Sequence, residues 1–157
     1  MMSWVRSGAI SALVGCLVLT ACSTWSADPP PPTYDIRSAS IVADKVIPPV
    51  SPALIDAVSD RVNAAIAITP HNTTLPAVAL TVRLTEVSKG RGFNKDRNTA
   101  KVNIDAASLD GGAVIAMASF DIATTAPDLS TADELMAEDI AARIRAIFSL
   151  NTPRLSE

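Results

Sequence analysis

The stretch that decides the fold is 100-AKVNIDAASLDGGAVIAMASFDI-122. Apolar and polar residues alternate from Ala100 to Ala106, and apolar residues again take every second position from Val114 to Ile122. A period of two is typical of a β-strand with one buried face. Asp110-Gly111-Gly112 lies between the two runs, and such residues adopt the positive φ angles of hairpin turns. The stretch therefore predicts two antiparallel strands joined by a turn.

Two more strands and a helix are expected before this hairpin. Residues 78–85 alternate in the same way, and residues 34–46 are β-like but irregular. Between them, the apolar residues of 52–68 recur at helical spacing, and Ser51-Pro52 supplies an N-cap serine followed by proline at the first helical position. A helix that joins two strands favours parallel, right-handed pairing of those strands.

A second helix is expected near the C-terminus. Thr131-Ala132-Asp133-Glu134 matches a capping box, which places the start of the helix at Thr131. The helix should end near Leu150. Its apolar face is expected to comprise Met136, Ile140, Ile144, Ile147 and Phe148.

Together these patterns predict an α+β domain in the order β-α-β-β-β-α. We expect a four-stranded, mostly antiparallel sheet with both helices on one face, because each of the last three strands has a single apolar face to bury. The opposite face of the sheet would then be left to solvent or to a partner.

Residues 1–21 have the features of a secretory signal: Arg6 supplies positive charge, and an apolar core and small residues follow. The core is shorter than the ~20 residues that a membrane-spanning helix needs, although an uncleaved membrane anchor remains the alternative. The segment ends in Leu19-Thr20-Ala21-Cys22, which resembles the lipobox of bacterial lipoproteins. The resemblance implies that the signal peptide is cleaved before Cys22 and that Cys22 is lipidated and acylated, with chains such as palmitate. Ser23, where an inner-membrane lipoprotein has Asp, implies the outer membrane and its periplasmic side.

The rest of the chain divides into three parts. Residues 22–33 form the lipidated cysteine and a tether whose four consecutive prolines favour polyproline II. This tether is expected to be a spacer, with a ligand for a proline-binding domain as the alternative. Residues 34–150 form a single domain, and residues 151–157 are a C-terminal tail.

The composition argues against several functions. The net charge of −3 gives no electrostatic footprint for nucleic acid. With Cys16 removed and Cys22 lipidated, the mature chain has no free thiol, and its one histidine, His71, lies in a proline-flanked loop beside no evident nucleophile. Metal sites usually draw on His or Cys clusters. The protein is therefore expected to be no enzyme and to use no metal or cofactor.

The acids Asp133, Glu134, Glu138 and Asp139 look like a paired acidic site. A solvated helix start, favoured by the helix dipole, is the preferred interpretation of these acids.

Two surfaces are candidates for binding a partner. The first is the loop 88–98, which is basic in an acidic chain and carries one of the few aromatic residues. A long, solvated hairpin tip with Phe93 packed back on the sheet is the preferred interpretation of this loop. The second is a small apolar spot on the open face of the sheet, next to the predicted turn; a β-bulge there is the alternative. The candidate residues are Lys89, Arg91, Phe93, Lys95 and Arg97 in the loop, and Ile115 and Met117 on the sheet.

Three hypotheses of function follow. The first is a non-catalytic outer-membrane lipoprotein that faces the periplasm. Such a protein would be an accessory, assembly or binding subunit of an envelope complex, with an envelope protein or an anionic envelope component as its partner. The strand and helix order also loosely resembles small accessory lipoproteins of the envelope. The second hypothesis is a carrier of small molecules or lipids with a cavity between helices and sheet. The third is a hydrolase, which would need His71 within hydrogen-bond reach of an acid and of a Ser or Thr.

Overall fold

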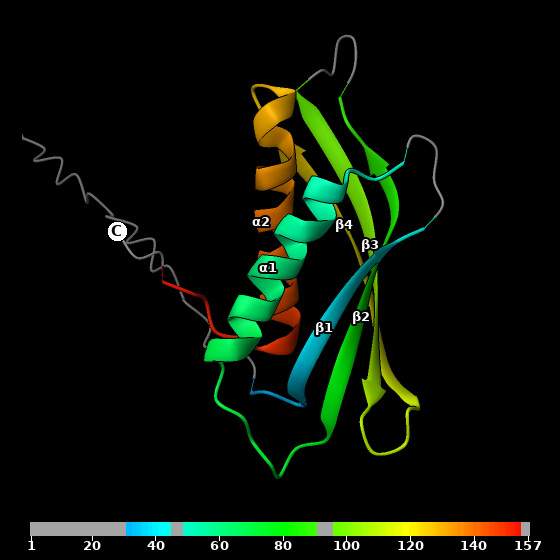
Figure 1. Cartoon of the computed structure of the whole chain (residues 1–157), viewed down its shortest axis with the longest axis vertical. Helices are drawn as coiled ribbons and strands as arrows, with labels where there is room; N and C mark the ends of the chain where they lie inside the picture. The colour runs from blue at the N-terminus through cyan, green and yellow to red at the C-terminus, as the bar shows by residue number, and fades with distance from the viewer. Residues whose placement is uncertain (1–30, 45–48, 91–95, 155–157) are drawn as a thin grey trace, which may run out of the picture.

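The computed structural model describes residues 31–44, 49–90 and 96–154. The four strands are β1 (Asp35–Ala43), β2 (Ala77–Ser88), β3 (Arg97–Ser108) and β4 (Val114–Thr125), and the two helices are α1 (Pro52–Ile68) and α2 (Leu129–Phe148). The sheet has the order β1-β2-β3-β4, with β1 and β2 parallel and the other neighbours antiparallel. Both helices cover the same face (Figure 1). The predicted α+β fold is confirmed.

Helix α1 begins as the sequence predicts. Pro52 is its first residue, and Ser51 has an extended backbone whose carbonyl oxygen accepts from the N–H groups of Leu54 and Ile55 at 3.1 and 3.3 Å. The Ser51 side chain makes no capping hydrogen bond. The fixed φ of proline and the backbone bonds therefore carry this helix start.

Helix α2 begins two residues earlier than the predicted capping box, so that prediction is wrong. Asp128 is the N-cap, and its carboxylate accepts from the backbone N–H of Thr131 at 2.9 Å. A carboxylate near a helix start also interacts favourably with the helix dipole. At the other end, Ser149 takes a left-handed conformation with φ of 54°, and the N–H of Leu150 donates to the carbonyl of Arg145 at 3.0 Å.

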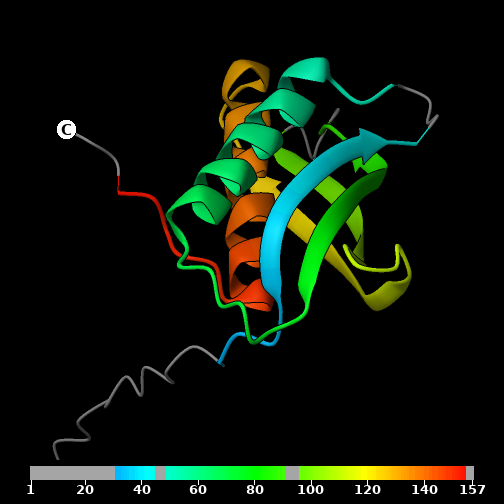
Figure 2. The ribbon, with the colours of Figure 1, turned by 60° about the horizontal axis from the view of Figure 1, so that its bottom comes forward.

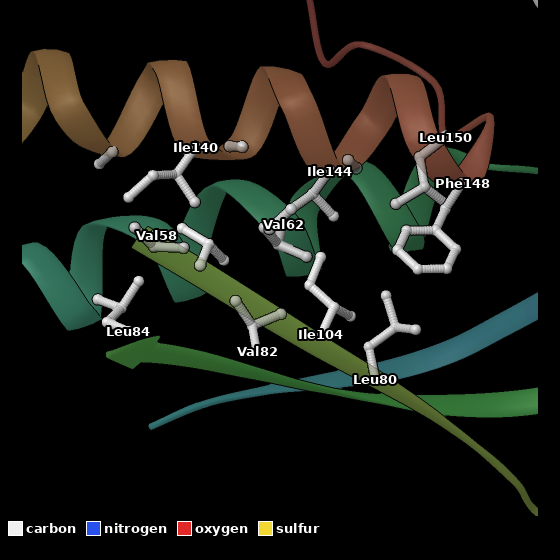
Figure 3. Packing of buried hydrophobic residues seen from close by; sticks show 14 of the residues in the cluster. Val58, Val62, Leu80, Val82, Leu84, Ile104, Ile140, Ile144, Phe148 and Leu150 are labelled. Carbon is white, nitrogen blue, oxygen red and sulfur yellow. The ribbon is translucent and has the colours of Figure 1, made fainter. Parts of the chain in front are cut away.

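The core lies between the helices and the sheet. Figure 3 shows aliphatic side chains of both helices facing those of β2 and β3, with Phe148 and Leu150 closing one end. Leu54, Val58, Val62, Val82 and Ile140 are fully buried. These side chains belong to one cluster of buried apolar residues that joins the helices to the sheet.

The bulge that was the alternative for the sheet spot is present in β4. Ala106 pairs with Ala116 but Ala107 pairs with Val114, so Ile115 is an extra residue in β4. The bulge turns Val114 to the solvent, where it is 54% exposed. The expectation that Val114 faces the core is therefore wrong, whereas Ala116, Ala118 and Phe120 do face inward. Ile147, expected on the apolar face of α2, is also exposed.

The molecule has two distinct ends, which Figure 1 shows at the bottom and the top. At the lower end β1 and β2 begin, both helices end and the β3–β4 turn lies. Hydrogen bonds link these segments: Asp35 N donates to Pro76 O, Leu109 N to Ala77 O, and Asn151 Nδ2 to Ile68 O. We call this the tether end, because Pro32 lies there. The far end holds the starts of both helices and the connection between β2 and β3.

Candidate functional site

The predicted basic loop is described only at its base. Arg91, Phe93 and Lys95 lie outside the described residues, as does Cys22, and their roles stay predictions. Lys89 lies at the end of the loop next to β2, and Arg97 is the first residue of β3 and is exposed. Both therefore lie at the far end of the molecule, away from the tether.

Lys89 already has a partner within the fold. Its ammonium lies 2.8 Å from Oδ1 and 2.9 Å from Oδ2 of Asp133 in the first turns of α2. The Asp133 carboxylate is only 15% exposed, so the contact ties the loop base to the helix. The positive charge of Lys89, which the sequence analysis assigned to partner binding, is therefore paired within the fold.

Asn98 also fixes the base of the loop. It is 1% exposed, its Oδ1 accepts from the backbone N–H of Gly90 at 3.1 Å, and its Nδ2 donates to the carbonyl of Asp96 at 3.4 Å. The same Asp96 carbonyl accepts from Ala126 N at 2.8 Å. A buried side chain thus sets where the loop leaves the sheet, and sequence reasoning missed it because a lone Asn carries no motif.

The acidic residues of α2 do not form an open acid pair. Arg61 of α1 contacts Glu134 at 2.5 Å and Glu138 at 3.2 Å, and Arg145 contacts Glu138 at 2.6 Å. The hydrogen bond from Arg145 lowers the pKa of Glu138, and the charge of Arg61 adds to that effect although burial opposes it. Asp139 accepts a hydrogen bond from the Thr124 hydroxyl. These carboxylates therefore join the two helices and the sheet, as structural groups.

The open face of the sheet is crossed by polar pairs. Arg83 lies 3.4 Å from Asp105, Lys101 lies 3.2 Å from Glu86, and the Ser119 hydroxyl lies 2.7 Å from Asn103 Oδ1. Opposite charges placed across neighbouring strands stabilise a sheet only modestly. The face is thus mostly polar.

Met117 is the most exposed large apolar side chain on this face. It is 79% exposed and lies on β4, where it pairs with Asp105 of β3. Ile115, the extra residue of the bulge, is 43% exposed. The structure therefore places both predicted sheet residues at the surface on one strand.

Strand β4 is also an edge of the sheet. In the described part of the chain it pairs with β3 on one side and with no strand on the other. It runs for twelve residues, VIAMASFDIATT, with Asp121 as its one charged residue and no proline. Natural edge strands are usually protected by charges, prolines or bulges, and an unprotected one can pair with another chain. Here the bulge protects only the first residues of the strand.

A cavity of about 480 Å³ lies at the tether end, and sequence reasoning did not predict it. Its walls are largely apolar, with Pro32, Tyr34, Leu75 and Phe148 among them, and Asp35 and His71 supply polar groups. It lies beside the core, not between the helices and the sheet. The carrier hypothesis expected a cavity between the helices and the sheet.

Asp35 is the buried charge of this cavity. It is 4% exposed, and its carboxylate lies 2.6 Å from the guanidinium of Arg37 and 2.9 Å from Nδ1 of His71. Burial raises the pKa of Asp35, but the hydrogen bond from His71 and the charge of Arg37 outweigh burial and leave the pKa below its ordinary value. A carboxylate can only accept, so Nδ1 of His71 carries the hydrogen in this contact.

His71 thus has an acid partner, which one part of the hydrolase hypothesis required. The hypothesis also requires a nucleophilic Ser or Thr hydroxyl within hydrogen-bond reach of His71. The Thr69 hydroxyl beside the cavity donates to Ala65 O at 2.7 Å and accepts from Asn151 N at 2.8 Å. Among the described residues, no hydrogen bond between His71 and a Ser or Thr hydroxyl is found.

Two searches of the described residues gave negative results. In residues 31–44, 49–90 and 96–154, no three His, Cys, Asp or Glu side chains gather as a metal site would require. Neither described helix is both long and apolar enough to cross a membrane.

Solved structures share the fold. The chain aligns with a protein from Xanthomonas campestris at a TM-score of 0.51 and 14% identity, over 73% of this chain and 83% of the other. It aligns with the PelC dodecamer from Paraburkholderia phytofirmans at a TM-score of 0.50 and 14% identity, over 75% and 89% of the two chains. A minor lipoprotein from Acinetobacter baumannii aligns at a TM-score of only 0.41 with 14% identity, over 80% and 100%, which carries no argument about this chain. No protein-family model and no curated protein matches. At these identities the likeness shows the fold alone.

Proposed function

We propose that this protein is a lipid-anchored, non-catalytic accessory subunit of an envelope complex. Cys22 holds it by acyl chains to the outer membrane on the periplasmic side. The signal segment and its lipobox-like end, Leu19-Thr20-Ala21-Cys22, support the anchor. A single acyl chain binds a membrane only marginally, so stable anchoring calls for the several chains that a lipoprotein cysteine carries.

The exposed edge strand β4 is the observation that carries the binding role. Its outer backbone groups have no partner strand in the described part of the chain, and Met117 projects from it at 79% exposure. An incoming extended segment can form main-chain hydrogen bonds along such an edge and bury the side chain of Met117. The partner is therefore expected to add a strand to β4.

Two kinds of partner suit this edge. One is a different protein of the envelope, which the accessory role implies. The other is a second copy of the chain. The similar PelC structure is that of a dodecamer, so self-association must be measured alongside other partners.

The basic loop is the second proposed contact. Its described residues Lys89 and Arg97 lie at the far end, one sheet length from the tether. Strands of twelve residues span roughly 40 Å at about 3.3 Å per residue. The base of the loop is therefore far from the tether, where a protein or an anionic glycan of the periplasm can reach it.

The carrier hypothesis remains the alternative. It requires a cavity between the helices and the sheet, where the described apolar side chains form one buried cluster (Figure 3). The cavity beside Asp35 and His71 lies elsewhere. Small molecules that bind the purified protein, with no protein partner captured, would favour the carrier.

Crosslinking in cells tests the proposal. A photoreactive residue replaces Met117 on β4, and a matched control replaces Leu135, which is 41% exposed on the helical side. A second comparison changes Arg91, Phe93, Lys95 and Arg97 together to alanine. The proposal predicts a discrete crosslinked band from position 117 and none from position 135.

The outcomes separate the contacts. A band at position 117 that survives the loop changes identifies β4 as the main site, and a band that they abolish makes the loop part of the same site. A band of twice the chain mass identifies a second copy as the partner. Absence of any discrete band from position 117 contradicts the docking role.

A further inference from the structure

Exposed large apolar side chains are concentrated at one end of the molecule. The described part of the chain has eight of them, and five lie at the tether end: Ile68, Leu109, Val114, Ile115 and Ile147. The other three are Met117 along β4 and, at the far end, Val42 and Leu135. Single exposed apolar residues are ordinary on a protein surface, but their concentration on one side marks a contact surface.

The fold brings these five residues to the same end from distant parts of the sequence. Ile68 and Ile147 lie in the last turns of α1 and α2, and Leu109, Val114 and Ile115 lie in or beside the β3–β4 turn. Figure 2 turns this end toward the viewer, with the end of α2, the end of α1 and the start of β1 close together. We call these five side chains, two at the helix ends and three at the β3–β4 turn, the apolar rim of the tether end.

The charges of this end are few and of both signs. Asp35 is paired with Arg37 and Arg145 with Glu138. Asp110 in the turn, Arg143 near the end of α2 and Arg154 on the tail are exposed. The far end, by contrast, holds ion pairs such as Lys89 with Asp133. Among the described residues these positive and negative charges partly offset one another, so we expect the surface that contacts the rim to be apolar and without strong charge.

The tether determines which surface lies within reach. The described chain enters at this end, where Pro31 and Pro32 line an open hollow together with Ala142 and Ala146 of α2. Cys22 precedes Pro31 by nine residues (31 − 22), a span of at most about 32 Å even when fully extended. The apolar rim is therefore the part of the domain that an acylated Cys22 would hold closest to the lipid surface.

We propose that the tether end is a membrane-contact surface, on which Ile68, Leu109, Val114, Ile115 and Ile147 insert shallowly among zwitterionic phospholipid headgroups. The inference rests on the proposed anchor at Cys22 and adds the orientation of the domain to it. Tyr34, the one tyrosine of the chain, lies at the same end. Its apolar ring and polar hydroxyl suit the boundary between lipid and water.

The contact has a consequence for the partner sites. Apolar side chains in the headgroup region add to the binding that the acyl chains provide and remove the free rotation that a tether alone allows. The far end then points away from the membrane, and the long edge of β4 stands upright between the two ends. A partner can reach both without crossing the lipid.

Fluorescent labels on the full mature chain test the proposal. With Cys22 acylated, an introduced cysteine is the one thiol of the chain, so an environment-sensitive probe reports a single position. Leu109→Cys is compared with Leu135→Cys, and Val114→Cys with Val42→Cys. Each pair replaces the same residue type, exposed at opposite ends of the fold.

Each labelled protein is reconstituted in vesicles of phosphatidylethanolamine and phosphatidylcholine, with and without a lipid that carries a quencher just below the headgroup. The expected result is a blue shift and strong quenching at positions 109 and 114, and neither at positions 135 and 42. The quenching should persist in high salt, because the contact is apolar and salt screens only charges.

Three results would overturn the inference. Equal quenching at both ends, or at neither, on a chain that floats with the vesicles shows an anchored domain without this contact. A blue shift at positions 109 and 114 that is the same in detergent and insensitive to the quencher shows that protein covers the rim. A chain that fails to float with the vesicles removes the Cys22 anchor, and with it both this inference and the proposed function.

Discussion

Changing Met117 to serine should weaken partner binding without unfolding the protein. Complete burial of a methionine side chain stabilises by about 1.5–3 kcal/mol. Met117 is 79% exposed in the free chain, so about four fifths of that stabilisation, roughly 1.2–2.4 kcal/mol, is still available to a partner on β4. Its loss corresponds to a rise in Kd of roughly 7- to 50-fold.

The assay has two parts. The Kd of the captured partner, or of self-association where that partner is a second copy, is measured for the native chain and for Met117→Ser. The free energy of unfolding in urea is measured in parallel and should change by less than about 0.5 kcal/mol, because the side chain contacts little in the free protein.

Leu135→Ser is the matched control. Leu135 is also exposed, but on α2, away from β4. It should leave the Kd unchanged. An unchanged Kd for Met117→Ser, or an equal loss for Leu135→Ser, would refute the reasoning that places the partner on the edge strand.

Three further predictions concern the fold that supports these surfaces. Ile140→Ala should lower the free energy of unfolding by about 2–5 kcal/mol, because Ile140 is fully buried. Ile147→Ala should lower it by under about 1 kcal/mol, because Ile147 is exposed. Urea titrations that rank the two variants in the opposite order would contradict the packing. Asn98→Ala should cost about 1–2 kcal/mol, because the Gly90 N–H loses its acceptor, and faster hydrogen exchange at that amide checks the cause. Asp35→Asn should destabilise the folded protein at neutral pH. The pKa of Asp35 in the folded protein lies below its ordinary value. The charged Asp35 therefore stabilises the fold at pH values above the ordinary pKa, and this stabilisation is lost as the pH falls through the folded pKa. Urea titrations from neutral pH to about pH 3 should therefore show the native and variant curves converging, and a difference independent of pH would speak against the ion pairs of Asp35.

The sequence predicted the elements well where one face of each is buried. Burial imposes a period of two on the strands and of 3.6 on the helices, and runs such as 100–106 show it directly. The bulge at Ile115 was open between two interpretations, because one extra residue changes which side chains face the core without changing the composition of the strand. The predicted start of α2 was wrong because two possible N-cap residues, Asp128 and Thr131, lie three residues apart. The carboxylate of Asp128 is the group that caps the helix.

The contacts of Asp35 could not be found from a local pattern. His71 lies 36 residues from it, and the two meet because parallel strands begin at the same edge of the sheet. The prediction that β1 and β2 are parallel therefore implied that residues at or before the starts of the two strands lie near one another. The ion pair of Lys89 with Asp133 had no such signal, since it depends on how α2 packs beside the end of β2.

The account depends most on the acylation of Cys22, because the anchor sets both the location and the orientation of the domain. The mass of the mature chain purified from membranes tests it directly. We predict a chain that begins at Cys22 and carries a diacylglyceryl group and an additional acyl chain, and that Cys22→Ala leaves unprocessed or soluble. A mature chain with an unmodified cysteine, or with a different first residue, would contradict the account.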